Sequence, residues 1–151
     1  MSFLNAVINK LEDEVLSEEL QERVDLIQHK IKFMEQVTVA CLDTENHLNF
    51  DLEGIINDAG GVLQADISQA RVLIYLEKGA GMLEMMGIVP SLLNKDWPAV
   101  EYNRVYLLDD QAAEASDASA MVALLEDIAE MLYPGYFIFG NEGKNWSSFG
   151  V

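Results

Sequence analysis

The chain has little positive charge and almost no cysteine. Its 151 residues include nine Lys and Arg against 26 Asp and Glu, which gives a formal net charge of −17. The single cysteine, Cys41, has no partner within the chain for a disulfide. Cys41 stands in an apolar run, where a thiol is more often a small buried hydrophobe than a nucleophile. A chain of this length buries enough surface to fold without a disulfide or a metal.

Long apolar stretches are missing as well. No window approaches the roughly 18 apolar residues that a membrane-spanning helix requires. The first ten residues lack the basic start and the apolar stretch of a signal peptide. We therefore expect a cytoplasmic protein that does not contact the membrane.

The sequence carries no glycine-rich phosphate loop and no catalytic motif. The two histidines, His29 and His47, stand 18 residues apart and belong to no metal-ligand motif. The segment that begins at Asp43 offers oxygen ligands, but Leu48 and Gly54 occupy the positions where an EF-hand loop has Gly and Glu. These observations predict no cofactor and no resident metal, and they favour a protein that is not an enzyme.

The acidic residues are concentrated in two segments. Residues 33–70 contain seven acids and no Lys or Arg, and residues 105–143 contain eight acids and no Lys or Arg. A field of this sign repels nucleic acids and anionic lipids, whereas it attracts cationic surfaces. We therefore predict no direct binding of nucleic acid, and a basic protein surface as the partner.

Helical spacing is clearest in two regions. Between residues 20 and 34 the apolar residues recur every three or four positions, so they form one face of a helix. This stripe lasts only about two heptads, which favours packing on the protein's own core over a coiled coil. A late helix is predicted to begin at Asp117 or Ser119 and to end before Pro134.

The remaining apolar segments read as short strands and hairpins. Residues 67–78 are open to either helix or strand, because a short apolar run does not distinguish them. The other expected elements are a hairpin over residues 37–52, a short helix over 82–86, a strand over 102–108, and a closing hairpin over 136–151. We predict an α+β fold class, with an antiparallel sheet built from hairpins, packed against N-terminal helices and one late helix. A single domain is expected over residues 1–151.

The first functional hypothesis is a non-catalytic protein-binding module. Such a module would dock an acidic face on a basic partner, as an inhibitor, an immunity-like or chaperone-like protein, or a mimic of DNA charge. Electrostatic steering would be followed by burial of an aromatic anchor. The predicted partner-binding residues are Asp109, Asp110, Glu114, Asp117, Glu126, Asp127, Glu130 and Trp146.

Two other hypotheses stay open from the sequence. The second is a small carboxylate- or metal-dependent hydrolase, in which at least two of Asp43, Asp51, Asp109 and Asp110 meet in a cleft. Asp109 and Asp110 directly follow a predicted strand, a position from which carboxylates can hold Mg²⁺. The third is a structural subunit that forms a homodimer through the helix of residues 20–34.

Overall fold

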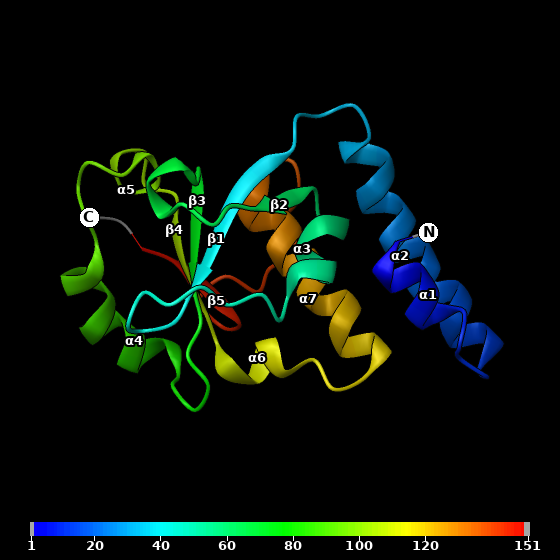
Figure 1. Cartoon of the computed structure of the whole chain (residues 1–151). Coiled ribbons are helices and arrows are strands. Elements are labelled where there is room, and N and C mark those ends of the chain that lie inside the picture. The colour runs from blue at the N-terminus through cyan, green and yellow to red at the C-terminus, as the bar shows by residue number, and fades with distance from the viewer. Residues whose placement is uncertain (1, 150–151) are drawn as a thin grey trace.

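The computed structural model describes residues 2–149, and its strands form one sheet in the order β2-β1-β3-β4-β5 (Figure 1). β1 pairs in parallel with β2 and with β3, and β3 pairs in parallel with β4. β5 runs antiparallel to β4 at the edge of the sheet. The strands are β1 (Val37–Leu42), β2 (Gly61–Leu63), β3 (Val72–Tyr75), β4 (Val105–Leu108) and β5 (Trp146–Ser148).

The central strands bury both of their faces. Every residue of β3 and β4 is buried, and so is every residue of β1 except the half-buried Thr38. A strand covered on both sides shows a continuous apolar run instead of alternation. This is why periodicity could not assign residues 67–78. The structure resolves them into a single 3₁₀ turn, η1 (Ile67–Gln69), followed by β3.

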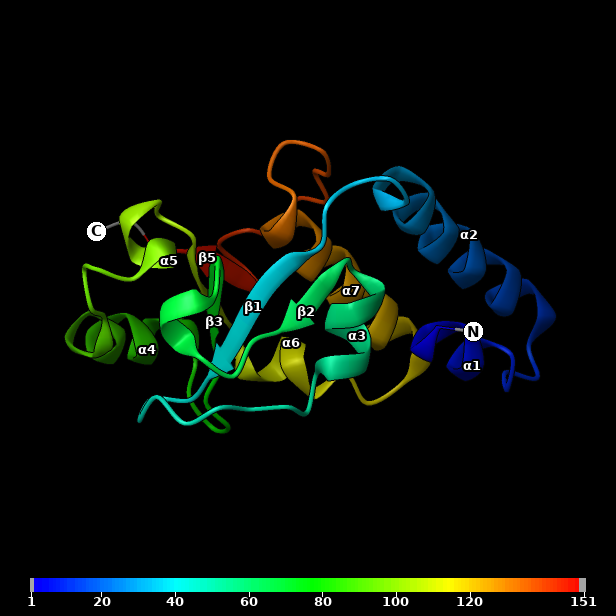
Figure 2. The same ribbon diagram turned by 45° about the horizontal axis from the view of Figure 1, so that its top comes forward.

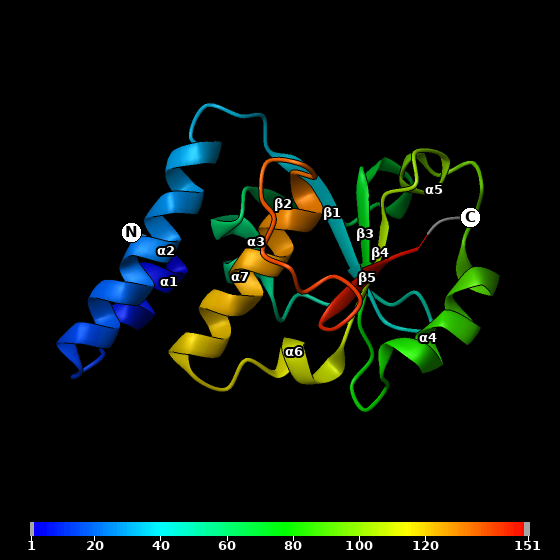
Figure 3. The ribbon, with the colours of Figure 1, turned by 180° about the vertical axis from the view of Figure 1, so that it is seen from behind.

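One face of the sheet is covered by α1 (Phe3–Ile8), α2 (Glu14–Ile31), α3 (Glu53–Asp58) and α7 (Ala118–Leu132). Figure 3 shows α7 between the sheet and α2, so that α2 forms an outer layer. Leu20, Val24 and Ile27 of α2 are fully buried there. The predicted helix is confirmed, and its apolar stripe is internal. The predicted stripe is therefore covered within the fold and is not free to pair two subunits.

The opposite face is covered by α4 (Met82–Ile88), η2 (Val89–Leu92) and α5 (Pro98–Glu101). Figure 2 shows α4 and α5 on the far side of the sheet from α1 and α2. The remaining helix, α6 (Asp110–Glu114), follows β4 directly. Across residues 2–149, no helix has both the length and the apolar character needed to cross a bilayer.

The expected mixture of helices and one sheet is confirmed, whereas the antiparallel hairpins are wrong. Residues 43–52 contain no second strand: the chain turns back at His47, makes one isolated bridge between Leu42 and Leu48, and then enters α3. The alternation seen in the sequence reflects a loop that packs Leu48 and Leu52 inward. Residues 136–139 form no strand either, and β5 pairs with β4 instead.

The buried stripe of α2 yields a stability prediction. We expect Ile27→Ala to lower the free energy of unfolding by about 2–4 kcal/mol, because a fully buried side chain leaves a cavity beside α7. The matched control is Leu26→Ala, which removes a neighbouring side chain that is 54% exposed and which should cost well under half as much. Urea unfolding followed by circular dichroism measures both. Equal losses for the two variants would contradict the placement of this helix.

Candidate functional site

The parallel strands all point in one direction, so the segments that follow them leave from the same end of the sheet, the lower end in Figure 1. We call this end, where the carboxyl ends of the parallel strands lie, the carboxyl edge. The segment after β1 leads to β2 on one side, and the segment after β2 returns to β3 on the other side. The direction of winding therefore changes between β1 and β3. In open α/β sheets, ligands bind outside the carboxyl ends of the strands at such a switch point.

A pocket of about 340 Å³ lies at this edge, within the size range of small-ligand sites. A neighbouring hollow of about 380 Å³ shares Asn49, Asp51, Leu76 and Lys78 with it. The pocket draws its lining from three separate segments, those that follow β1, β3 and β4. Its residues are Asn49, Asp51, Leu52, Leu76, Lys78, Asp110, Ala113 and Glu114.

The charged groups of this pocket are free of internal partners. Within residues 2–149, the carboxylates of Asp51, Asp110 and Glu114 accept no hydrogen bond and form no ion pair, and the ammonium group of Lys78 makes neither contact. Leu52 and Leu76 are buried and form an apolar floor beside them. The pocket thus combines three available carboxylates, one available ammonium group and an apolar surface.

Internal hydrogen bonds hold the segment after β1 in place. The hydroxyl of Tyr75, at the end of β3, donates to Asn46 Oδ1 over 2.7 Å, and Asn46 Nδ2 donates to the carbonyl of Leu92 over 3.1 Å. Asn46 has a φ of 61°, a left-handed conformation that Asn tolerates better than most residues. Thr44 donates from its hydroxyl to Glu77, which joins this segment to the one after β3. These bonds fix the edge of the sheet on which the pocket is built.

The residues considered for metal or nucleophilic chemistry have structural roles. The Asp43 carboxylate accepts hydrogen bonds from the backbone N–H groups of Glu45 and His47, and these bonds and the nearby His47 lower its pKa despite its partial burial. Burial raises the pKa of the Cys41 thiol to about 12, which disfavours the nucleophilic thiolate. In the part of the chain that the structure describes, no three His, Cys, Asp or Glu side chains are grouped so that they could hold a metal ion.

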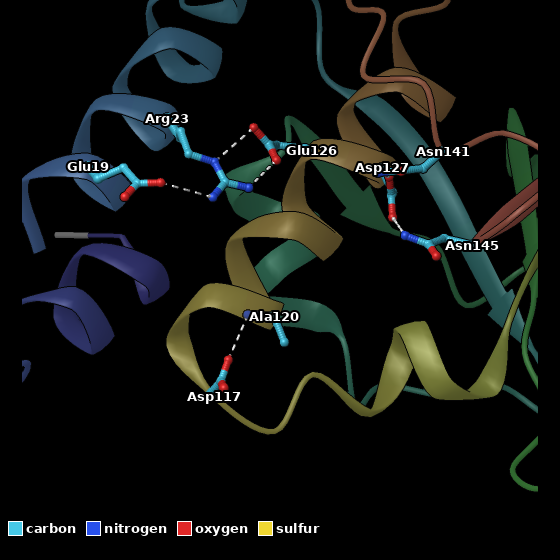
Figure 4. Close-up of polar contacts among 8 residues, drawn as sticks. All are labelled: Glu19, Arg23, Asp117, Ala120, Glu126, Asp127, Asn141 and Asn145. Carbon is cyan, nitrogen blue, oxygen red and sulfur yellow. Dashed lines mark hydrogen bonds and ion pairs between the residues drawn. The ribbon is translucent and has the colours of Figure 1, made fainter. Parts of the chain in front are cut away.

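Most of the eight residues predicted from the sequence to bind a partner are engaged within the fold. Asp109 caps α6 by accepting a hydrogen bond from Gln111 N, and Asp117 caps α7 by accepting one from Ala120 N. Glu126 pairs with Arg23 of α2 (Figure 4), which joins the outer helix to α7. Glu130 accepts a hydrogen bond from the backbone N–H of Phe139 over 2.7 Å.

Asp127 and Trp146 lie inside the molecule. Asp127 is 1% exposed, and its two oxygens accept hydrogen bonds from the side-chain amides of Asn141 and Asn145 over 3.0 and 3.1 Å (Figure 4). Trp146 is 3% exposed and packs edge-on against Tyr106. Of the eight residues, Asp110 and Glu114 meet at the pocket described above.

Asn49, Leu76 and Lys78 were missed by the sequence reasoning. Their signal is positional, because each follows the carboxyl end of a strand that runs parallel to its neighbours. An expectation of antiparallel hairpins hides this signal, since it sends neighbouring strand ends to opposite edges of the sheet.

Comparison with solved structures identifies the fold. An ABC transporter substrate-binding protein from Listeria monocytogenes matches with a TM-score of 0.60 and 17% identity, over 86% of this chain and 62% of that one. A TroA-like periplasmic binding protein from Veillonella parvula matches with a TM-score of 0.60 and 14% identity, over 82% and 47%. A periplasmic heme-binding protein from Pseudomonas aeruginosa matches with a TM-score of 0.55 and 16% identity, over 87% and 60%. No protein-family model and no curated protein matches the sequence.

The chain therefore has the fold seen in periplasmic binding proteins and spans about half to three fifths of the length of these structures. The comparison contradicts the hypothesis of an inhibitor or immunity-like module that docks on a basic protein, because the similar structures are named as binders of transported substrates or heme. Asp51 and Asp110 do line one pocket, as the hydrolase hypothesis required, but the comparison gives no support to a hydrolase or to a structural subunit. The expected cytoplasmic location is contradicted too, since these structures are named as periplasmic or transporter proteins.

The burial of Asp127 gives the stability of the fold a predicted pH dependence. Burial raises the pKa of this carboxyl above its ordinary value of 3.8, more than the two asparagine amides lower it, and Glu126 and Glu130 raise it further. The folded state therefore holds the proton more tightly than the unfolded state. The resulting stabilisation is present at low pH and is lost as the pH rises above 3.8 through the raised pKa.

The variant Asp127→Asn removes this titration and retains an amide that can hydrogen-bond. We expect the free energy of unfolding of the wild type, relative to Asp127→Asn, to fall as the pH rises from about 3.5 to about 7. Urea unfolding at a series of pH values measures the difference. Asp127→Ala leaves both asparagine amides without their acceptor, so it should cost about 1–3 kcal/mol near neutral pH. A constant or rising difference between the wild type and Asp127→Asn would contradict the assigned direction.

Proposed function

We propose that this protein is a small-ligand-binding module that takes up a positively charged ligand at the carboxyl edge of its sheet. The single observation that carries the proposal is the pocket in which Asp51, Asp110 and Glu114 present carboxylates without internal partners. The likeness of the fold to proteins named as substrate-binding and heme-binding supports binding of a small molecule at this place. The proposal treats residues 1–151 as one domain.

The charge of the pocket supports a cation. Three carboxylates face one ammonium group, so the lining is negative, and the surrounding field of a chain with a net charge of −17 has the same sign. A hollow lined mainly by charge of one sign raises the local concentration of a ligand of the opposite sign. Other acids on this edge, such as Asp109, are satisfied by backbone N–H groups and contribute charge at longer range.

The apolar floor supports a ligand with an organic body. Leu52 and Leu76 are buried beneath the charged groups, and Ala113 adds a small side chain at the wall. Ligand pockets commonly join apolar walls to a few placed polar groups that fix orientation. An amine attached to a ring or an alkyl chain satisfies both parts of this lining.

Benzylamine is a suitable probe, because it carries one ammonium group on a flat apolar ring. We expect its titration into ¹⁵N-labelled protein to shift the backbone amide signals of Asp51, Lys78 and Glu114 with saturation in the millimolar range expected of so small a ligand. Asp51→Asn and Asp110→Asn should each weaken binding by about three- to tenfold, since each removes a charge-assisted contact. Lys78→Gln should strengthen binding, because it removes the one opposing charge.

The matched control is Asp117→Asn, which removes one negative charge outside the pocket and leaves a residue able to cap α7. Its affinity for benzylamine should equal that of the wild type. If benzylamine gives no saturable shifts, or if the Asp51 and Asp110 variants bind it like the control, then the carboxyl edge is not a cation site and the proposal fails.

A further inference from the structure

The opposite end of the sheet, the upper end in Figure 1, is where the parallel strands begin, and we call it the amino edge. A second pocket lies there, and its charged residues are basic instead of mainly acidic. It measures about 420 Å³ and is lined by Arg71, Pro98, Tyr102 and Arg104. Two of the nine basic residues of this acidic chain therefore meet in one hollow, and none of the residues that line it is acidic. The arginines come from adjacent parallel strands, since Arg71 directly precedes β3 and Arg104 directly precedes β4.

Neither arginine is neutralised by a strong internal ion pair. Arg71 lies 3.8 Å from Glu35 through Nη1, and the Glu35 side chain is 88% exposed, so this pair contributes little. Arg104 makes no ion pair within residues 2–149. Its contacts are with neutral groups: Nη2 donates to the carbonyls of Met131 and Leu132, and Nε donates to the hydroxyl of Tyr106.

The contacts of Arg104 also hold its guanidinium in position. The two carbonyls at the end of α7 lie 3.1 and 3.0 Å from Nη2, and the Tyr106 hydroxyl lies 3.1 Å from Nε. Because these bonds order the side chain in the absence of a ligand, its full positive charge is presented at little cost in conformational entropy. Arg71 is exposed and supplies a second guanidinium that can adjust to an incoming group.

Tyr102 adds a flat surface to this charge. Its side chain is 68% exposed, although it is a large aromatic, and it lines the pocket together with the ring of Pro98. An exposed tyrosine ring next to two guanidinium groups matches a ligand that combines a flat ring with an oxyanion. The ring of such a ligand can lie against Tyr102 while its carboxylate or phosphate accepts hydrogen bonds from the guanidinium fork of Arg71 and from Nη1 of Arg104, whose Nε and Nη2 are used within residues 2–149.

We propose that the pocket of Arg71, Tyr102 and Arg104 is a binding site for a small aromatic oxyanion. It is separate from the cation site at the carboxyl edge in its place, its lining and the charge of its ligand. The two proposals therefore stand or fall independently.

Benzoate tests this site, because it has the ring of benzylamine and the opposite charge. We expect its titration into ¹⁵N-labelled protein to shift the amide signals of Arg71, Tyr102 and Arg104 with saturation, and to leave those of Asp51 and Glu114 in place. Benzylamine should do the reverse. A parallel titration with phenyl phosphate assigns the preferred headgroup, since the ligand that binds more tightly identifies it.

Variants of the lining give the sharper test. Arg71→Gln should weaken benzoate binding by about tenfold, since it removes one charged fork but not the internal bonds of Arg104. Tyr102→Ala should weaken it by about three- to tenfold, whereas Tyr102→Phe keeps the ring and should bind like the wild type. Lys144→Gln, which removes an exposed basic residue that lines neither pocket, is the matched control and should leave the affinity unchanged.

Three results would overturn the proposal. The first is that neither benzoate nor phenyl phosphate gives saturable shifts at the amino edge. The second is that the wild type and Arg71→Gln bind benzoate equally well, and the third is that benzylamine shifts the amino-edge signals as much as benzoate does. The cation site can be wrong while this one is right, because its variants and its probe report on a different set of amide signals. Far-ultraviolet circular dichroism of each variant confirms that a loss of binding is not a loss of folding.

Discussion

The structure depends on the burial of β3 on both of its faces. Val72 and Ile74 pack towards α7, and Leu73 and Tyr75 pack towards α4 and α5, with none of the four measurably exposed. A strand in this position needs paired neighbours on both sides, and both neighbours, β1 and β4, run parallel to it. Parallel pairing requires a long connection that crosses to the other end of the sheet. Every following segment therefore starts from the same edge, and the candidate site is a consequence of that topology.

This arrangement divides the acidic residues into two kinds. Asp109 and Asp117 satisfy backbone N–H groups at the starts of helices, and Asp127 accepts hydrogen bonds from two side-chain amides, so all three carboxyl groups have partners within the fold. Asp51, Asp110 and Glu114 have no such role within the described residues, and they meet at the carboxyl edge. The net charge of the chain identifies neither group. What separates them is which carboxylates have hydrogen-bond partners, and this can be read only from the folded structure.

The sequence predicted elements better than it predicted their pairing. The 20–34 stripe, the late helix that Asp117 caps, the short helix near Met82 and the strand beginning at Val37 all appear, and the strand predicted over 102–108 is present in its second half, from Val105. The hairpins failed because the alternation of residues 47–52 has the same period as a half-buried strand, although a turn closed at Asp43 and His47 produces it. Only part of the pocket could be predicted from the sequence. Asp51 and Asp110 were considered as carboxylates, but Lys78 and Leu76 can be assigned to the pocket only when β1, β3 and β4 are known to be parallel. One sequence does not determine whether two strands pair in parallel or antiparallel, because the same short apolar run can be followed by a crossover helix or by a hairpin turn.

The direction of the strands also explains how one small, strongly acidic chain can carry two regions of opposite charge. Parallel strands have two chemically distinct edges, because every strand begins at one and ends at the other. Arg71 and Arg104 precede their strands and so share the amino edge, whereas Lys78 and Asp110 follow theirs and share the carboxyl edge. In an antiparallel sheet of hairpins the same residues would alternate between the edges and their fields would partly cancel. The parallel order therefore places Arg71 and Arg104 at one end of the strands and Asp51, Asp110 and Glu114 at the other, so residues of opposite charge line different pockets.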